Sequence, residues 1–316
     1  MTFNKKGEWT MEEVDDEKCE RCLRGGGELE PGPGSDAGPT YEIRECSELG
    51  RYLVAARDIA AGELVFRAAP IVSGLQSGSV PLCLGCYRPL QPPTRLGEEQ
   101  FCCPTCGWPL CSEDCVLSLR HQPECEATAR SGVRVHIRDP ERPDALYDCV
   151  ILIRCLMLRR QSPAHWAQLA AMEAHESKRR PPLQRRRARA LCALLKSRFG
   201  VEAEESEMLR LLAVLEVNAY EVRMPATNVQ AVYPIASLPE HSCIPNTFRT
   251  FERDLSVCVR AAMPIPRGHH ITVTYTDTLW GTLDRRANLY FSKHFLCACE
   301  RCADPYELGT CLAALT

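Results

Sequence analysis

The sequence predicts a β-rich α+β fold that is interrupted by a cysteine-rich block and a helical segment, and that ends in a second cysteine-rich segment. Three observations support this fold. Strand-like alternation with turn residues occurs on both flanks of the chain, at 41–78 and from about 228 onward. The twenty cysteines are clustered rather than dispersed. Helical periodicity is confined to about 145–220, so helices form an insertion between the strand-rich flanks.

The composition is that of a globular protein with a real core. The 316 residues are 45% hydrophobic, and this length favours two domains or one domain with a large insertion. A formal net charge of −3 argues against a surface for nucleic acid or membrane. No apolar run approaches the roughly 18 residues of a membrane span, and the N-terminus has no apolar leader segment. We therefore expect a monomer with no membrane partner, located in the nucleus or the cytoplasm.

The first forty residues have the composition of a disordered tail. They are acidic and then rich in Gly and Pro ("GGGELEPGPGSDAGP"), and such a segment cannot bury apolar surface. Cys19 and Cys22 within it form a single CxxC pair, which is weak evidence for a metal site. In the next stretch, "RYLVAARDIAAGELVFRAAPIVS", alternation predicts strands, and Ala60-Ala61-Gly62 predicts the turn between two of them.

The block over 79–126 carries eight ligands at the spacing of zinc sites. Without a secretory leader, disulfides explain its cysteines poorly. A CxxC turn places two sulfur atoms near one ion, while Cys-x3-Cys and His-x3-Cys place ligands one helical turn apart. Eight ligands are enough for two structural zinc ions, which would also stabilise a block with little apolar content. Cys102 is a spare that could be confused with its neighbour. The ligands are Cys83, Cys86, Cys103, Cys106, Cys111, Cys115, His121 and Cys125.

This block resembles a MYND zinc finger, ligand for ligand. MYND fingers commonly bind short proline-rich peptides, so the resemblance implies a proline-rich peptide as partner. The family crosses its two sites. The resemblance therefore implies one ion held by Cys83, Cys86, Cys111 and Cys115, and a second held by Cys103, Cys106, His121 and Cys125.

The segments around the finger resemble the SMYD family of SET and MYND protein-lysine methyltransferases, most closely its arthropod SmydA branch. "LGRYLVAARDIAAGELVF" resembles the opening of a SET domain. "LEVNAYEV", "YPIASLPEHSCIPN", "VRAAMPIPRGHHITVTYTD", "FLCACERC" and the ending "RCADPYELGT" then follow in the family's order. The match covers about 41–310. It implies a SET domain that is interrupted by the MYND finger and a helical insert and followed by a Cys-rich post-SET segment.

The resemblance also implies a domain organisation. Longer members continue into a helical C-terminal domain that walls the substrate cleft, whereas this sequence stops at Thr316, fourteen residues after Cys302. The expected segments are a disordered tail at 1–40, the N-terminal part of the SET domain at 41–78, the MYND finger at 79–126, a helical SET insert at 127–215, the SET catalytic core at 216–280, a post-SET zinc segment at 281–304 and a truncated C-terminal end at 305–316.

A third zinc site follows from the same resemblance. Cys297, Cys299 and Cys302 are one ligand short of four. In SET proteins of this kind the cysteine of the "HSC" motif is the fourth ligand, which here is Cys243. Such a site, the third zinc ion of the chain, would pin the C-terminal segment against the core. The alternative is that Cys243 is an unrelated core cysteine.

The implied reaction is methyl transfer from S-adenosylmethionine to a lysine. It needs a deprotonated amine, a narrow channel and polar oxygen atoms near the methyl group. By resemblance Tyr275, in "ITVTY", is the catalytic tyrosine that orients the amine; the alternative is a strand tyrosine with a hydrogen-bonded hydroxyl. The cofactor-binding residues implied by the match are Gly50, Arg51, Asn218, Ser237, His241 and Phe295.

Several positions depart from the family pattern. Tyr52 replaces the second glycine of a Gly-x-Gly cofactor turn, Glu240 stands where an Asn is usual, and Lys293 falls where a channel tyrosine is found. All three are expected near the cofactor. "GHHIT" replaces an acidic "GEE" turn, and we expect its two histidines, His269 and His270, to be surface turn residues.

Two functions stay open. The preferred one is a lysine methyltransferase with a protein substrate, histones among the candidates. The alternative is a catalytically impaired SET pseudoenzyme that acts as a MYND-mediated transcriptional co-regulator or adaptor, which the departures and the short C-terminal end favour. The Arg-rich stretch at 177–190 could be a nuclear address or an anion-binding patch, but we favour a solvated loop and helix face. The acidic balance argues against nucleic-acid binding through it.

Overall fold

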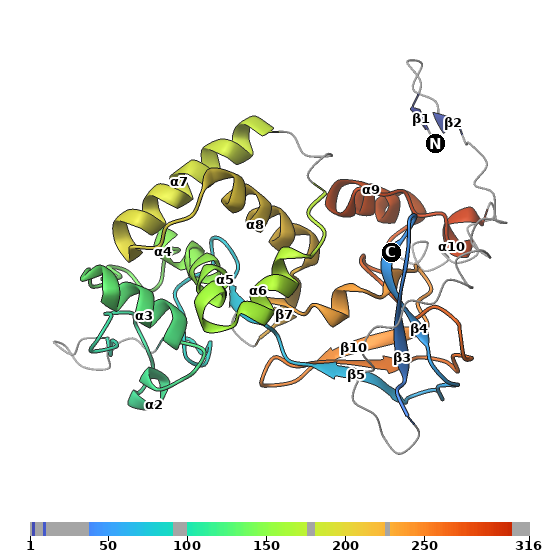
Figure 1. Ribbon diagram of the computed structural model, residues 1–316, viewed down its shortest axis with the longest axis horizontal. Coiled ribbons are helices and arrows are strands. Elements are labelled where there is room, and N and C mark those ends of the chain that lie inside the picture. The colour runs from blue at the N-terminus through green and yellow to red at the C-terminus, as the bar shows by residue number, and fades with distance from the viewer. Residues whose placement is uncertain are drawn as a thin grey trace.

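The computed structural model describes residues 38–90, 100–175, 181–224 and 228–304, together with the short antiparallel pair β1 (Thr2–Phe3) and β2 (Trp9–Thr10). Apart from that pair, residues 1–37, which include Cys19 and Cys22, lie outside the described residues. The start of the Arg-rich stretch, at 177–180, and the end of the chain, at 305–316, also lie outside them. Within the described part, most helices gather at one end of the molecule, whereas most strands, together with the two C-terminal helices, lie at the other (Figure 1).

The strands form several small sheets, which confirms the predicted β-rich α+β class. A hairpin of two strands lies beside two three-stranded antiparallel sheets of order β10-β11-β5 and β6-β8-β7, and β9 pairs in parallel with β12. The strands are β3 (Tyr41–Cys46), β4 (Gly50–Ala55), β5 (Leu64–Ala68), β6 (Val72–Leu75), β7 (Tyr220–Arg223), β8 (Asn228–Val232), β9 (Glu240–His241), β10 (Thr247–Phe251), β11 (Val257–Ala261) and β12 (Thr272–Val273).

The helices lie mostly between β6 and β7 in the chain, with two more at the C-terminal end. In the described residues none is long and apolar enough to cross a membrane. The helices are α2 (Glu113–Val116), α3 (Gln122–Ser131), α4 (Ala145–Asp148), α5 (Val150–Gln161), α6 (Pro163–Ala170), α7 (Pro181–Phe199), α8 (Glu205–Asn218), α9 (Thr282–Lys293) and α10 (Glu300–Ala303). A 3-10 turn covers Ile235–Ser237.

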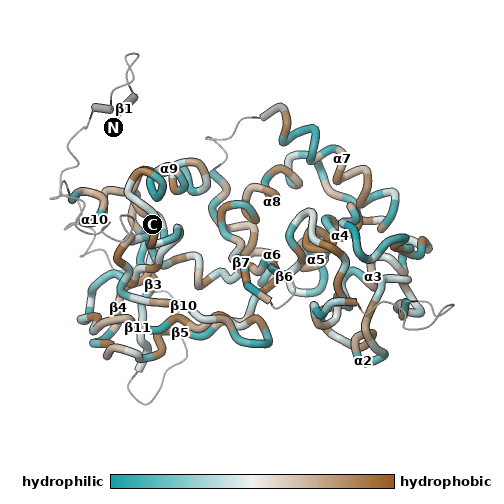
Figure 2. The backbone as a smooth tube through the Cα atoms, turned by 180° about the vertical axis from the view of Figure 1, so that it is seen from behind, coloured by the Kyte–Doolittle hydropathy of each residue, from teal (hydrophilic) through white to brown (hydrophobic). Residues whose placement is uncertain are grey.

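Helix α5 is the centre of the helical region. Its sequence "VILIRCLMLRR" is apolar on nearly all sides, so nine consecutive residues from Val150 to Leu158 are buried. Brown, hydrophobic tube gathers along α5 and the neighbouring β6 (Figure 2). The two elements touch at Gly74 of β6, where a Cβ atom would lie only 2.6 Å from the Cβ of Ile151. A glycine is therefore required for the helix to pack this close to the sheet.

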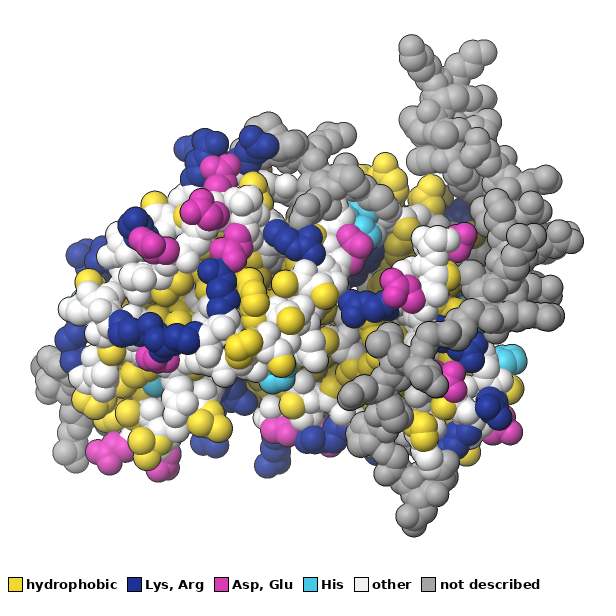
Figure 3. Space-filling model, viewed as in Figure 1, with side chains coloured by type: hydrophobic (Ala, Val, Ile, Leu, Met, Phe, Trp, Pro, Cys, Tyr) yellow, Lys and Arg dark blue, Asp and Glu magenta, His cyan; other side chains and the backbone are white. Residues whose placement is uncertain are grey.

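The Arg-rich stretch continues into the first turns of α7. Arg189 pairs with Glu205, Nε to Oε2 2.6 Å. On the face shown in Figure 3, basic side chains over the helical region are interspersed with acidic ones rather than gathered into one patch. This arrangement agrees with a solvated helix face for the described part of the stretch.

The C-terminal segment packs against the end of β9. Leu289 of α9 is fully buried together with three cysteines, Cys243, Cys297 and Cys302. Tyr275 and Phe295 pack on the edge of this cluster. The parallel pairing of β9 with β12 places the "HSC" motif beside the strand that leads to Tyr275, so sequence-distant segments meet at one place.

Candidate active site and metal centres

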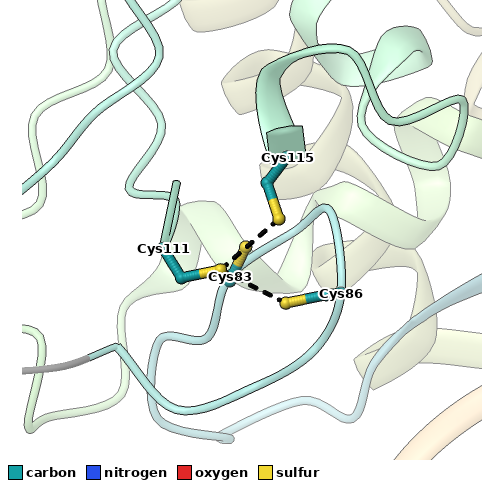
Figure 4. A group of neighbouring side chains, drawn as sticks. All are labelled: Cys83, Cys86, Cys111 and Cys115. Carbon is teal, nitrogen blue, oxygen red and sulfur yellow. Dashed lines mark hydrogen bonds between the residues drawn. The ribbon is translucent and has the colours of Figure 1, made fainter. Parts of the chain in front are cut away.

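The first cysteine cluster joins the two halves of the finger. The four sulfur atoms of Cys83, Cys86, Cys111 and Cys115 lie within 4.8 Å of one another and point inward (Figure 4). The Sγ atoms of Cys86 and Cys111 are 3.5 Å apart, and those of Cys111 and Cys115 are 3.4 Å apart. Tetrahedral zinc with Zn–S bonds of about 2.3 Å places its sulfur ligands roughly 3.8 Å apart, so this set fits one zinc ion.

The second cluster consists of Cys103, Cys106, His121 and Cys125, again within 4.8 Å. The Nε2 of His121 lies 3.4 Å from the Sγ of Cys106. Its Nδ1 lies 3.1 Å from a carboxylate oxygen of Glu124, so the ring turns Nε2 toward the sulfur atoms, as in histidine–zinc sites with a carboxylate partner. Both clusters follow the crossed ligand sets that the resemblance implied. Cys102 lies outside them, and its Sγ donates to the carbonyl of Gln100.

The third cluster brings Cys243 to Cys297, Cys299 and Cys302, with all four sulfur atoms within 4.8 Å. The Sγ of Cys243 lies 3.5 Å from that of Cys302 and 3.9 Å from that of Cys297. Four thiolates with one zinc ion carry a net charge of −2, which is costly to bury without a counter-charge. The fully buried guanidinium of Arg285 supplies one: its Nε lies 3.2 Å from the Sγ of Cys243.

Sequence reasoning missed Arg285, and it also missed a buried pair behind the second cluster. Arg154, in the middle of α5, donates to both carboxylate oxygens of Glu124 at 2.5 and 2.7 Å. A signal for this pair existed, since a single arginine inside the apolar run "VILIRCLML" must find an internal partner. Arg285 carries no such signal, because its neighbours Asp284 and Arg286 are also charged.

Most of the predicted cofactor and catalytic residues line one pocket of about 660 Å³. It lies between the end of α8, the "HSC" region, β10, Thr274–Tyr275 and the segment after α9. Glu240 and Lys293 also line it, together with Arg249 and Glu173, which sequence reasoning did not single out. The predicted residues found in its wall are Asn218, Ser237, His241, Tyr275 and Phe295.

Gly50 and Arg51 do not line this pocket. They form the start of β4 after the turn whose residues Glu48 and Leu49 do line it. Gly50 has a φ of 67°, a left-handed conformation that glycine adopts most easily, so its observed role is to shape that turn. The guanidinium of Arg51 donates to the carbonyl of Ala171 at 3.1 Å.

His241 connects the third cysteine cluster to the strand of Tyr275. Its Nδ1 accepts the backbone N–H of Tyr275 at 3.0 Å, and its Nε2 lies 3.3 Å from the Sγ of Cys243. Burial, and then the charge of Arg285, lower the pKa of His241 to about 4, so the ring is neutral at pH 7. The proton therefore lies on Nε2, on the side of the Cys243 Sγ. Through these two contacts the His241 ring links the pocket wall to the cysteine cluster.

Three aromatic rings meet at this wall. The ring of His241 lies 5.4 Å from that of Tyr275 and 5.8 Å from that of Phe295, centroid to centroid. The Tyr275 hydroxyl donates to the carbonyl of Pro239 at 2.6 Å, and burial raises its pKa, so it remains a neutral phenol. Its lone pairs can accept a hydrogen bond from an amine in the pocket.

Lys293 projects into the pocket from the end of α9. Its Nζ donates to the carbonyl of Val217 at 2.5 Å and lies 5.8 Å from the centroid of the Tyr275 ring. Burial lowers its pKa, the charge of Arg249 lowers it further, and Glu216 opposes the shift. The pocket thus contains an amine of the protein's own.

The expectations for Tyr52 and His270 were wrong. Tyr52 is fully buried and does not line the pocket. Its ring stacks on that of His270 at 4.8 Å with an interplanar angle of 21°. His270 is therefore not a surface turn residue, although His269 is exposed. The Nδ1 of His270 bonds the carboxylate of Glu240. Three departures from the family pattern thus form one contact cluster, in which the carboxylate of Glu240 has a histidine partner.

The residues of the pocket suit S-adenosylmethionine. Asn218 uses its NH₂ group on the carbonyls of Glu173 and Val214, both at 2.8 Å, so its amide oxygen remains an acceptor for an ammonium group. Phe295 offers a ring for an adenine, and Glu173 and Arg249 offer opposite charges for the two ends of an amino acid. A volume of about 660 Å³ accommodates a ligand of this size.

Known proteins resemble this chain over most of its length. SET domain-containing protein SmydA-8, isoform A, of Drosophila melanogaster is 32% identical over 287 residues, covering 88% of this chain and 59% of that protein. Histone-lysine N-methyltransferase ASHR1 of Arabidopsis thaliana is 24% identical over 272 residues, covering 83% and 55%. This chain therefore spans somewhat over half the length of the curated relatives that it matches.

One similar solved structure is the SET domain of LSMT bound to lysine and AdoHcy. The match covers 82% of this chain and 53% of the LSMT chain, with a TM-score of 0.44 and 11% sequence identity. That overlap is too loose to carry an argument. The family model described as the SET domain, in contrast, matches residues 50–276, which include the pocket residues Asn218, His241 and Tyr275. The segment is well over half of the chain, and the SmydA-8 match extends beyond it, so the resemblance is confirmed: this chain belongs to the SET domain family.

Proposed function

We propose that this chain is an S-adenosylmethionine-dependent protein-lysine methyltransferase whose MYND-type finger binds a proline-rich peptide. The observation that carries the proposal is the pocket itself. It gathers Asn218, His241 and Tyr275 from separate elements around a volume suited to the cofactor. Relatives named histone-lysine N-methyltransferase support the same reaction and make a histone one candidate substrate.

S-adenosylmethionine supplies an electrophilic methyl group when it is bound. The chain's own residues would then do two things. Asn218 and Phe295 would hold the ligand, and the neutral Tyr275 hydroxyl would orient an amine. The zinc ions are proposed as structural, because every ligand position in the three clusters is filled by protein.

A second candidate function is an adaptor without methyltransferase activity. Lys293 favours it, because its side chain occupies part of the pocket that a substrate lysine would have to enter. Glu240 supports it less than the sequence suggested, since its carboxylate is engaged by His270. In this case the finger, which exposes Leu117 and Leu119, would be the working part. For either function we propose the nucleus or the cytoplasm.

Calorimetric titration of S-adenosylmethionine into zinc-replete protein tests the proposal. We expect micromolar binding by the parent protein. Phe295→Ala should weaken it by about 1–3 kcal/mol, the usual contribution of a ring stacked on a base. Phe291→Ala is the matched control, because Phe291 lies four residues earlier and is 75% exposed.

The outcomes separate the two candidates. Binding that depends on Phe295 but not on Phe291 supports the methyltransferase, and a screen of lysine peptides would follow. Absence of binding by the parent, restored in Glu240→Asn, would show a cofactor site that this carboxylate disables. Absence of binding by both, with a folded and zinc-loaded protein, would overturn the methyltransferase proposal and leave the adaptor.

A further inference from the structure

Lysine is rare in this chain, and one of its few lysines lies in the pocket. The sequence has 6 lysines and 32 arginines. Within the described residues the lysines are Lys196 and Lys293. Lys196 is on the solvent side of α7, 70% exposed, with its Nζ 2.9 Å from a carboxylate oxygen of Glu202. Lys293 lines the same pocket as Tyr275.

The amine of Lys293 is held in place by two contacts. Its Nζ donates to the carbonyl of Val217 at 2.5 Å, and Val217 directly precedes Asn218 in the wall of the pocket. The centroid of the Tyr275 ring lies 5.8 Å from the same Nζ. A carbonyl acceptor fixes one N–H direction, so a neutral amine here would direct its lone pair away from that carbonyl.

The surroundings also favour the neutral form of this amine. Burial lowers the pKa of Lys293, and Arg249 adds to the effect. The opposite holds for Lys196, whose pKa is raised by its bond to Glu202. Only a neutral amine has the lone pair needed to attack a methyl group. Lys293 therefore has the properties of an acceptor amine, because it lies in the pocket, is fixed by the Val217 carbonyl and has a lowered pKa.

We propose that Lys293 is an internal methyl acceptor, so that the pocket methylates its own lysine. This inference rests on the function proposed above. The Nζ lone pair forms a bond to the methyl carbon of S-adenosylmethionine, and the carbon–sulfur bond breaks with its electron pair left on sulfur. The neutral amine and the sulfonium become a methylammonium and the thioether S-adenosylhomocysteine. The proton of the original ammonium passes to solvent before the step.

The modification would lie where an external lysine has to come closest to Tyr275. The product is a methylammonium, which is positively charged and carries a methyl group in place of one N–H donor of a lysine ammonium. Two orientations of the methylated Nζ would then compete. In one it keeps its hydrogen bond to the Val217 carbonyl, and in the other the methyl group is rotated toward the pocket. Self-methylation would therefore change the access of a protein substrate to the same site.

The first test uses protein without cofactor. Zinc-replete protein is acylated with an N-hydroxysuccinimide ester over a range of pH, and the labelling of Lys293 and Lys196 is followed by peptide mass spectrometry. We expect the labelling of Lys293 to reach its midpoint at a lower pH than that of Lys196. A midpoint equal to or above that of Lys196 would remove the chemical basis of the proposal.

The second test adds S-adenosylmethionine to the same protein. We expect a methyl group on Lys293, none on Lys196, and loss of the mark in Lys293→Arg. The first-order rate should not change with protein concentration, because donor and acceptor belong to one chain. A rate that rises with concentration would mean transfer between molecules and would overturn an internal acceptor.

Calorimetric binding of the cofactor, measured on the same sample, separates two kinds of failure. Binding without a mark on Lys293 rejects self-methylation alone and leaves the methyltransferase proposal in place. No binding at all rejects the proposed function and the internal acceptor together. A third outcome combines two results: the parent protein carries no methyl group on Lys293, and Lys293→Met methylates an added peptide faster than the parent does. That outcome would show that Lys293 only obstructs the pocket.

Discussion

The carboxylate of Glu124 lies between the ring of His121 and the guanidinium of Arg154, and all three side chains are buried. Arg154 also donates to the carbonyl of Ser73 in β6 at 2.8 Å. His121, a member of the second cluster, is therefore connected through the side chains of Glu124 and Arg154 to strand β6. The finger and the rest of the protein share one buried polar network.

Loss of Arg154 should destabilise the whole protein. Arg154→Met leaves the Glu124 carboxylate buried without its guanidinium, a change that costs about 3–5 kcal/mol in other buried pairs. The free energy of unfolding, measured by denaturant titration, should fall by that order. Arg160→Met is the matched control on the same helix, because Arg160 pairs with Glu126 and both side chains are about half exposed. It should cost less than about 1 kcal/mol. Similar costs for both variants would contradict the network.

Loss of Arg285 should release zinc from the third cluster first. Arg285→Met removes the guanidinium beside the Sγ atoms of Cys243 and Cys302. Partners of this kind typically change metal affinity by about 10–100-fold. Of the three zinc ions proposed above, competition with a chromophoric chelator should show one leaving at lower chelator concentration. Arg253→Met, at an exposed position, should leave all three ions as in the parent protein. Unchanged release from Arg285→Met would rule out this role.

Tyr52 should matter for stability and not for the cofactor. Its ring is fully buried against His270, so Tyr52→Ala opens a cavity that costs about 3–5 kcal/mol. Tyr52→Phe keeps the ring and should cost far less. Because Tyr52 does not line the pocket, Tyr52→Phe should bind S-adenosylmethionine with unchanged affinity in calorimetry. A large loss of affinity in this variant would show that its hydroxyl acts on the cofactor site.

Glu240 and His270 should be energetically coupled. Their side chains bond each other across the β9–β12 region. A double-mutant cycle with Glu240→Gln and His270→Phe should give a coupling of about 0.5–3 kcal/mol in the free energy of unfolding. The cycle of Glu240→Gln with His269→Phe is the control, since His269 is exposed. Equal coupling in both cycles would mean that the contact has no specific energy.

Glu63 should give a pH-dependent contribution to stability. Its carboxylate accepts from Arg57 at 2.6 Å and from the backbone N–H of Ala60 at 2.9 Å, and these two bonds, in that order, lower the pKa of Glu63. A folded pKa below the unfolded one gives stability that is present above the unfolded pKa and is lost as pH falls through the folded pKa.

Glu63→Gln should therefore lower the free energy of unfolding at pH 7 by less than about 1 kcal/mol, because the pair is partly exposed. The difference from the parent protein should shrink as pH falls below about 4, near the ordinary pKa of a glutamate. Denaturant titrations of both proteins in parallel measure it, and Glu141→Gln at an exposed position is the control. A difference that grows in acid would contradict the assigned direction.

The membership of the three cysteine clusters could be predicted because much of its information is local. CxxC and Cys-x3-Cys spacings already place sulfur atoms near one another, and the resemblance supplied the pairing of Cys83 with Cys111 and of Cys243 with the C-terminal cysteines. Strand and helix segments followed from alternation and periodicity in the same way. His121 and Glu124, three residues apart at the start of one helix, were also within reach of such reasoning.

What only the tertiary structure decided concerns side chains that meet across long sequence distances. The contact of Tyr52 with His270 and the place of Arg285 between Cys243 and Cys302 depend on which face each strand or helix turns inward. The amine of Lys293 meets the carbonyl of Val217 for the same reason. The sequence by itself determined the fold family, the ligand spacing and the motif order, since these are properties of neighbouring residues. Packing decided which charges share a buried space, because burial and partners arise only when distant segments come together.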